Sequence, residues 1–198
     1  GGSGLFVCDS GNHCVQVLTR SGGFLRQIGS QGYQSGFMDH PIGVCVDGEG
    51  RLAVSEWGNA RLQIFDVATG SCVRVVKELA WCDSRGEEVL EADPSGFIRE
   101  LGLPVGVSFS PQGYLYVTDA YFHRVIVLDQ YFEPIQKFGS GAGYGDVEPW
   151  TEPFRAMRGR EMPLGGREHA PLGGSDSMQL NQPSDVAASR GRVIVVDR

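Results

Sequence analysis

Short runs of alternating apolar and polar residues recur along the chain and are separated by turn residues. The runs are four to six residues long, and Gly, Pro, Asp or Asn stands between many of them. Alternation with a period of two is typical of half-buried β-strands, whereas a helix repeats its apolar positions every three to four residues. We therefore predict an all-β protein built from many short strands.

One ten-residue pattern occurs three times. The stretch DSGNHCVQVL at residues 9–18 aligns with EWGNARLQIF at 56–65 and with DAYFHRVIVL at 119–128. Each copy opens on an acidic residue and closes on an apolar alternation, and a fourth copy begins at Asp197. The recurrence indicates that the chain is built from one structural unit used several times.

The segments on either side of this pattern repeat as well. Residues 41–56, 104–119 and 183–197 align with each other, and residues 24–30 match 134–140. The copies define four strands per unit, which we name a to d in chain order. The predicted strands are a at 43–46, 106–109 and 185–188, b at 5–8, 51–55, 114–118 and 192–196, c at 15–18, 62–65 and 125–128, and d at 24–28, 72–76 and 134–138. An antiparallel four-stranded unit of about 40 residues is typical of a β-propeller blade.

The chain is predicted to be one propeller domain over residues 1–198. Its blade segments are 1–39, 40–102, 103–181 and 182–198, with long insertions between strand d and the next strand a at 77–102 and 139–181. About three blade periods are present, and propellers have at least four blades. We expect either a fragment of a longer propeller or, if the chain is complete as given, a dimer that joins three blades from each copy.

The pattern P-x-G-V-x-V-D, followed by G-R-L-x-V-x-D-x-G-N-x-R-L-Q-I-F, resembles the NHL repeat. The resemblance covers most of residues 4–76, 103–140 and 182–198. It implies a propeller that commonly has six blades, of which this chain holds about half. In animal relatives such propellers often follow ubiquitin-ligase modules, and some bind RNA, so the resemblance implies a binding module.

The turns between strands b and c share one face of the propeller with the d–a connections, because successive strands of an antiparallel blade alternate in direction. We call this the b–c face. Aromatic and Arg side chains are common anchors of protein interfaces, although rings in these turns also have neighbouring blades to pack on. The predicted partner contacts on this face are His13, Trp57, Tyr121, Phe122 and His123, with Arg155 and Arg158 in the second insertion.

The acidic residue that opens each copy is used once per blade, which favours a structural role over a catalytic one. We predict that it accepts N–H bonds from the b–c turn and pairs with the Arg five residues later. The predicted blade fasteners are Asp9, Glu56, Asp119 and Asp197, with Arg61 and Arg124. Cys14 replaces that Arg in the first copy.

No catalytic, metal or cofactor motif is recognised in the sequence. The fold implied by the resemblance is similar to that of the peptidyl-amidating lyase, whose zinc-binding His residues follow the Pro that opens strand a. Ile42, Val105 and Ser184 occupy those positions here. His13 and His123 lack a third ligand, so we predict no metal site. A non-catalytic module for a protein or peptide partner is therefore predicted; the alternative is an enzyme whose active residues lie outside this chain.

Composition narrows the choice of ligand. The formal net charge is −7, which disfavours RNA or DNA, although Arg155, Arg158, Arg160 and Arg167 keep an RNA-binding propeller as the second prediction.

No apolar run approaches the roughly 18 residues of a membrane helix. The five Cys residues include no C-x-x-C pair, which favours a cytoplasmic protein, and Cys8 and Cys45 are predicted core residues. Residues 85–90 are predicted to form a short helix.

Overall fold

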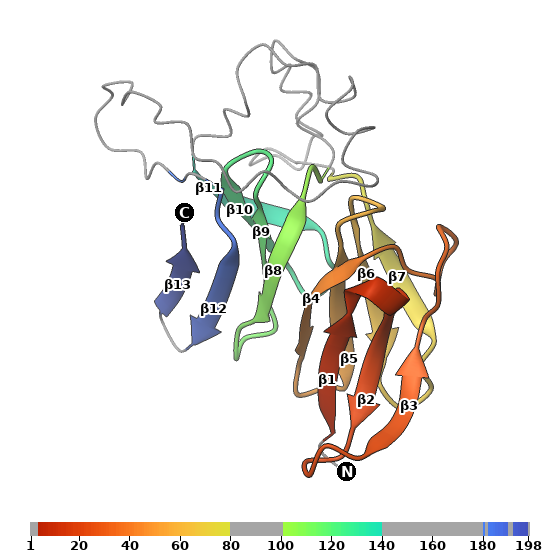
Figure 1. The fold of residues 1–198 in the computed structure, drawn as a ribbon. Helices are drawn as coiled ribbons and strands as arrows, with labels where there is room; N and C mark the ends of the chain where they lie inside the picture. The colour runs from red at the N-terminus through yellow and green to blue at the C-terminus, as the bar shows by residue number, and fades with distance from the viewer. Residues whose placement is uncertain (1–3, 80–100, 140–179, 181, 190–191, 198) are drawn as a thin grey trace, which may run out of the picture.

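The computed structural model describes residues 4–79, 101–139, 180, 182–189 and 192–197. In these residues it contains thirteen β-strands in four antiparallel sheets and one 3₁₀ turn (Figure 1). The all-β prediction is therefore confirmed. The predicted helix at 85–90 and most of both insertions lie outside the described residues, and no helix among the described residues is long and apolar enough to span a membrane.

The strands follow the predicted pattern within two residues at each end. Blade 1 has β1 (Leu5–Asp9), β2 (Cys14–Leu18) and β3 (Phe24–Ile28), with the 3₁₀ turn η1 at Ser10–Asn12. Blade 2 has β4 (Pro41–Val46), β5 (Arg51–Glu56), β6 (Arg61–Asp66) and β7 (Cys72–Val76). Blade 3 has β8 (Pro104–Phe109), β9 (Leu115–Asp119), β10 (Arg124–Leu128) and β11 (Pro134–Phe138), and the last sheet has β12 (Asp185–Ser189) and β13 (Arg192–Val196).

The register of the strands repeats from blade to blade. The acid that opens each copy lies opposite the fifth residue after it, so Asp9 pairs with Cys14, Glu56 with Arg61 and Asp119 with Arg124. The pairing of strands c and d shifts at the equivalent place in all three blades, just before the last residue of each four-residue strand c predicted above. The sequence repeat therefore corresponds to a repeat of backbone geometry.

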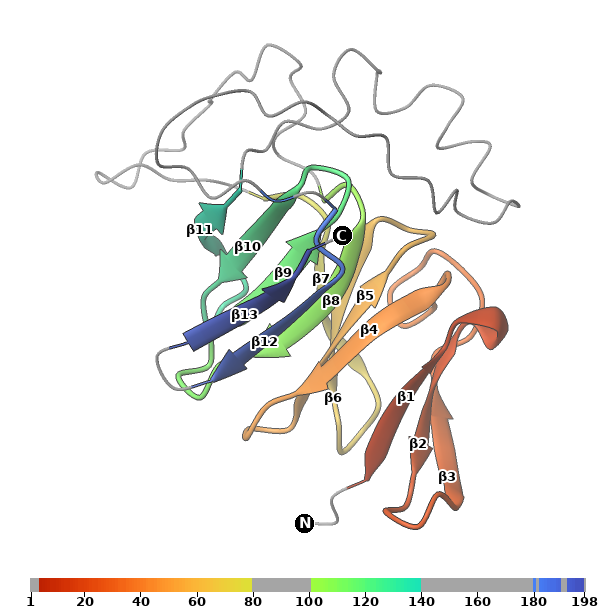
Figure 2. The same cartoon turned by 60° about the vertical axis from the view of Figure 1, so that its left-hand side comes forward.

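The blades lie side by side with their a strands next to one another (Figure 2). β4 packs beside β8, β8 packs beside β12, and β1 approaches β4 from the other side. In Figure 1 the b–c turns lie at the upper edge of the sheets and the a–b turns at the lower edge, as the strand alternation predicts.

A glycine in strand a allows this close approach. A Cβ atom on Gly43 would lie 2.1 Å from the carbonyl oxygen of Val105 and 2.6 Å from Ser55 Oγ. A Cβ atom on Gly106 would lie 2.6 Å from Cα of Asp185 in the following sheet. These separations are shorter than van der Waals contact. The Gly of the Pro-x-Gly-Val pattern is therefore required because the backbone of the next blade lies against it.

The hydrophobic core consists of two clusters, one on each side of blade 2. Val15, Val17, Ile28 and Met38 pack with Leu52, Val54 and Phe65 between blades 1 and 2. Ala53, Leu62 and Ile64 belong to the second cluster, which they form with residues of blade 3 such as Val107, Val117 and Ile126. Because alternate residues of β5 face opposite blades, this strand is buried on both sides from Leu52 to Glu56.

Two partly buried thiols give a first testable prediction. Cys8 and Cys45 pack against the two clusters, and burial raises the pKa of both thiols to about 12. Because the thiolate is the reactive form, we expect both residues to resist iodoacetamide at pH 7.5 in the folded protein and to react after unfolding in urea. Mass spectrometry of tryptic peptides measures the labelling. Equal labelling of Cys45 in the two states would contradict the observed packing.

Candidate functional site at the b–c face

The acid that opens the second copy is fully buried and surrounded by donors. Arg61 Nε donates to Glu56 Oε1 at 2.8 Å, Gln63 Nε2 donates to the same oxygen at 2.6 Å, and Asn59 Nδ2 donates to Oε2 at 2.6 Å. The backbone N–H of Asp39 donates to Oε2 at 2.9 Å. A carboxylate held by four donors in the interior is suited to fastening chain segments together and is poorly placed to act as a catalytic base.

Arg61 extends this network to the loop at residues 29–40, which joins β3 to β4. Its guanidinium donates to the carbonyl oxygens of Tyr33 at 2.6 Å, Gln34 at 3.1 Å and Phe37 at 2.8 Å. Gln63 Nε2 donates to the same Phe37 oxygen at 2.6 Å. One buried ion pair therefore sets the conformation of the d–a connection on the b–c face.

Blade 3 repeats the arrangement with Asp119. Arg124 Nε and one terminal nitrogen donate to Asp119 Oδ2 at 3.1 and 3.0 Å. The N–H of Gly102 donates to the same oxygen at 3.2 Å, and the N–H of Leu103 donates to Oδ1 at 2.9 Å. The Arg124 guanidinium lies 4.6 Å from the centroid of the Phe122 ring. Both acids are thus paired with the Arg five residues later.

The amides that reach these acids differ from the sequence prediction. They belong to the segment before strand a, at Asp39, Gly102 and Leu103, and not to the b–c turn. In blades 2 and 3 the first turn amide instead donates to a carbonyl of that segment, from Trp57 to His40 and from Ala120 to Leu103. The acids therefore join two segments distant in sequence, which a local turn motif does not predict.

The first copy replaces the ion pair with neutral hydrogen bonds. Asp9 accepts from Asn12 Nδ2 at 2.9 Å and from Gln16 Nε2 at 3.1 Å, and these bonds hold the pKa of Asp9 below its ordinary value. Cys14, in the position of the missing Arg, is buried. Asp197 is the last described residue, and its role as a fastener remains a prediction.

The His residues of the b–c turns connect one blade to the next. His13 Nδ1 accepts the N–H of His40 at 3.2 Å, and His123 Nδ1 accepts the N–H of Gln182 at 2.9 Å. Both donors directly precede the Pro of the following strand a, and both His residues have a left-handed backbone, with φ of 56° and 49°. In blade 2 the equivalent residue is Ala60, whose side chain carries no hydrogen-bond acceptor. The amide of Leu103, which directly precedes Pro104, donates to Asp119 instead.

Burial separates the predicted partner contacts into two groups. Phe122 and His123 are only 7% and 8% exposed, so these two side chains pack inside the protein and do not belong to a surface for a partner. They are buried because the ring of Phe122 lies against Arg124 and His123 bonds the next blade. Trp57 and Tyr121 remain half-buried, and Arg155 and Arg158 lie outside the described residues.

Two aromatic side chains that the sequence reasoning missed lie on the same face. Tyr33 is 75% exposed and Phe37 is 42% exposed, and Arg61 and Gln63 hold the loop that carries them. This loop falls outside the aligned parts of the repeat. An alignment of strands draws attention to the b–c turns and passes over such a connection.

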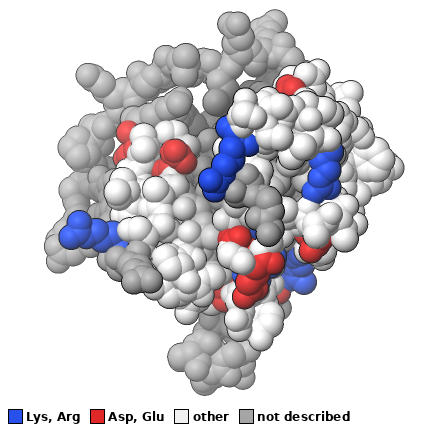
Figure 3. Space-filling view, turned by 90° about the horizontal axis from the view of Figure 1, so that it is seen from below, with Lys and Arg blue, Asp and Glu red and all other residues white. Residues whose placement is uncertain are grey.

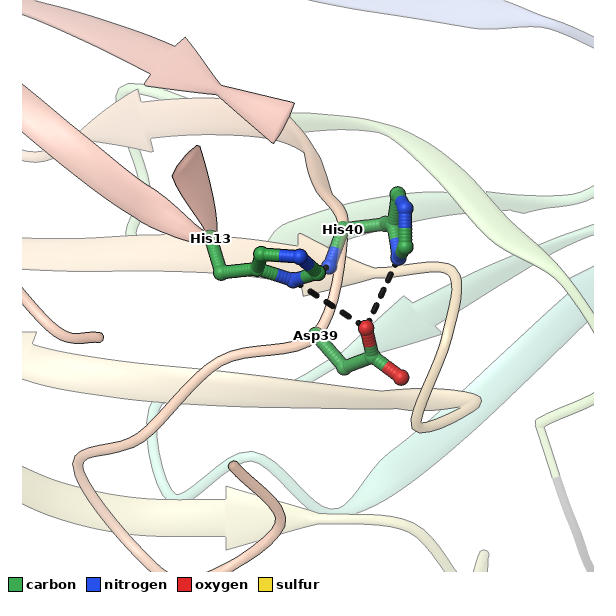
Figure 4. A group of neighbouring side chains, drawn as sticks. All are labelled: His13, Asp39 and His40. Carbon is green, nitrogen blue, oxygen red and sulfur yellow. Dashed lines mark hydrogen bonds and ion pairs between the residues drawn. The ribbon is translucent and has the colours of Figure 1, made fainter. Parts of the chain in front are cut away.

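A second group missed in the sequence surrounds His13 at the junction of blades 1 and 2 (Figure 4). Asp39 Oδ1 lies 3.1 Å from His13 Nδ1 and 2.7 Å from His40 Nδ1, so the three side chains converge on one point. The His40 ring also makes an edge contact with Trp57, with centroids 5.5 Å apart. A signal was present in the sequence, because Asp39 and His40 precede the Pro of strand a where the other copies have Gly-Leu and Asn-Gln.

Comparisons with known proteins agree with the repeat and the fold. The NHL repeat model matches residues 38–65. The chain is 41% identical over 58 residues to the B-box type zinc finger protein ncl-1 of Caenorhabditis elegans, which covers 29% of this chain and 6% of that protein. It is 29% identical over 108 residues to the E3 ubiquitin-protein ligase TRIM32 of Homo sapiens, which covers 54% of this chain and 16% of the relative. The matches therefore span only a small part of either relative.

Among solved structures, that of U3-55K is similar with a TM-score of 0.50 and 14% identity, over 69% of this chain and 36% of that chain. At this identity the similarity concerns the fold alone.

Proposed function

Since the chain carries the NHL repeat and folds into β-propeller blades, we propose that it is a non-catalytic binding module whose b–c face takes a protein or peptide partner. The observation that supports this most directly is the group of exposed or half-buried rings on that face, at Tyr33, Phe37, Trp57 and Tyr121. Aromatic rings of this kind are the commonest anchors of protein interfaces.

The loop carrying Tyr33 and Phe37 is well suited to this role because its backbone is held in place. Three of its carbonyl oxygens accept hydrogen bonds from Arg61, and its Gly36 N–H donates to Gln63 Oε1 at 2.8 Å. A loop ordered before binding loses less conformational entropy when a partner arrives. The buried fasteners therefore serve the proposed surface indirectly.

The charge distribution supports a protein partner over RNA. On the face opposite the b–c face, shown in Figure 3, the described Lys and Arg residues are scattered among acidic and uncharged ones, so the described part of that face offers RNA no continuous basic track. The net charge of −7 also opposes binding to a phosphate backbone. The Arg cluster on which the RNA alternative depends lies outside the described residues.

The ubiquitin-ligase name of the human relative suggests a context for such a module. In a ligase, a propeller of this kind would select the protein to be modified. We propose this role for the b–c face on the strength of that similarity.

A matched pair of Tyr substitutions tests the proposal. Tyr33 is 75% exposed on the b–c face, and Tyr131 is 68% exposed in the β10–β11 turn on the opposite face. Proteins captured from a cell extract by the wild-type chain are identified by mass spectrometry, and the strongest is purified and titrated by calorimetry. We expect Tyr33→Ala and Trp57→Ala to weaken its binding at least about tenfold, which corresponds to about 1.4 kcal/mol, and Tyr131→Ala to leave it unchanged.

Circular dichroism of each variant shows whether the fold is preserved. Equal binding by the Tyr33 and Tyr131 variants would exclude the b–c face as the contact surface.

A further inference from the structure

We propose that His13, Asp39 and His40 form a Zn²⁺ site that fastens blade 1 to blade 2 and keeps one coordination position open to solvent. This inference concerns metal binding and does not depend on the identity of a protein partner. The three residues are the one group of potential metal ligands within 4.8 Å of one another in the described part of the chain.

The distances between the ligand atoms are close to those of a metal site. Zinc binds His nitrogen at about 2.0–2.1 Å and carboxylate oxygen at about 2.0–2.2 Å in tetrahedral geometry, which places neighbouring ligand atoms about 3.3 Å apart. The nitrogens of His13 and His40 lie 3.1 and 2.7 Å from Asp39 Oδ1. The ligand atoms of the two His residues lie within 4.8 Å of each other, and this pair closes toward about 3.3 Å when the three ligands surround one ion.

The metal-free arrangement at His13 contains a conflict that a cation removes. His13 Nδ1 faces both the N–H of His40, at 3.2 Å, and the carboxylate oxygen of Asp39, at 3.1 Å. A neutral Nδ1 accepts from the amide but directs its lone pair at the carboxylate, whereas a protonated Nδ1 pairs with the carboxylate and no longer accepts from the amide. With a metal ion between them, both the lone pair and the carboxylate donate to the same centre.

The ligands are reachable and their orientations are supported. The side chains of His13, Asp39 and His40 are 13%, 26% and 43% exposed, so an ion and a water ligand can enter from solvent. The edge contact with Trp57 supports the ring of His40, and the contact between the two His rings, with centroids 4.5 Å apart, places them on the same side of Asp39. Binding costs His40 its amide bond to His13.

The ligand set favours zinc and belongs to this junction alone among the three aligned copies. Two imidazoles and one carboxylate are ligands that zinc prefers, and three protein ligands plus water is the arrangement of open zinc sites. The residues before Pro104 and Pro183 are Gly102–Leu103 and Asn181–Gln182, which provide no imidazole or carboxylate. His123 is the equivalent of His13, but among the described residues it belongs to no group of three potential ligands.

Calorimetric titration of the metal-stripped, reduced full chain with ZnCl₂ at pH 7.5 tests the proposal. We expect saturable binding of one ion. His40→Ala and Asp39→Asn are expected to weaken it at least about tenfold, because loss of a group that only supports a metal ligand already costs that much. His123→Ala, which alters the equivalent His of blade 3, is the matched control and is expected to bind as the wild type does. Circular dichroism checks that each variant is folded.

Two further measurements separate this site from binding by thiols. Zinc is expected to raise the melting temperature of the wild type and not that of His40→Ala, because an ion that binds only the native state stabilises it. Titration with Co²⁺ is expected to produce d–d absorption without a thiolate charge-transfer band. A wild type that binds no ion, a His40→Ala variant with undiminished affinity, or a strong thiolate band would each overturn the proposal.

Discussion

Replacing Glu56 by alanine is expected to lower the free energy of unfolding by about 3–5 kcal/mol. The substitution leaves the Arg61 guanidinium, which is buried with its partner, without a counter-charge. It also removes the acceptor of Asn59, Gln63 and the Asp39 amide. Unpaired buried donors and an uncompensated buried charge are among the largest single-residue penalties known in proteins. Urea denaturation followed by circular dichroism measures the loss.

The chain provides its own control for this prediction. Asp9 occupies the equivalent position in the first copy, where Cys14 replaces the Arg. In the described part of the chain, its side chain accepts hydrogen bonds from the neutral amides of Asn12 and Gln16. We expect Asp9→Ala to cause a clearly smaller loss. If the two substitutions destabilised the protein equally, the buried ion pair would not be the source of the effect.

The second large effect is expected from Gly43→Ala. The added Cβ would lie 2.1 Å from the Val105 carbonyl oxygen, an atom of the neighbouring blade's backbone that cannot move away as a flexible side chain would. Overpacking of this kind typically costs about 1–3 kcal/mol. It would also disturb Ser55, whose hydroxyl accepts from the Gly43 amide at 2.9 Å and donates to Val105 O at 2.5 Å. Thermal and urea unfolding measure the change.

Gly48→Ala is the matched control, because Gly48 lies in the exposed a–b turn of the same blade and has no atom within 4 Å of its added Cβ. We expect it to change stability by less than about 0.5 kcal/mol, as surface substitutions usually do. A Gly43→Ala variant as stable as Gly48→Ala would mean that the a strands of blades 2 and 3 are not in the contact described.

The sequence predicted the positions of the strands far better than the exposure of individual side chains. Strand positions followed from the alternation and from the alignment of the copies, and the pairing of Glu56 with Arg61 followed from a spacing that recurs in blade 3. Exposure did not follow, since Phe122 and His123 look like surface residues of a polar turn. They are buried because Arg124 of the same blade covers Phe122 and the segment before the next blade covers His123, and the second contact depends on how neighbouring sheets pack.

The sequence by itself determined the all-β class, the four-stranded unit and the presence of the NHL repeat, because alternation and register are local properties that recur in each copy of the repeat. The tertiary structure decided which residues meet across blades. Asp39 and His40 are separated from His13 by two strands and a loop. Only the packing of blade 2 against blade 1 brings Asp39 Oδ1 to 3.1 Å from His13 Nδ1, beside the 2.7 Å contact with its neighbour His40. Such meetings depend on how neighbouring blades pack through their core clusters, and a linear pattern carries no record of those distances.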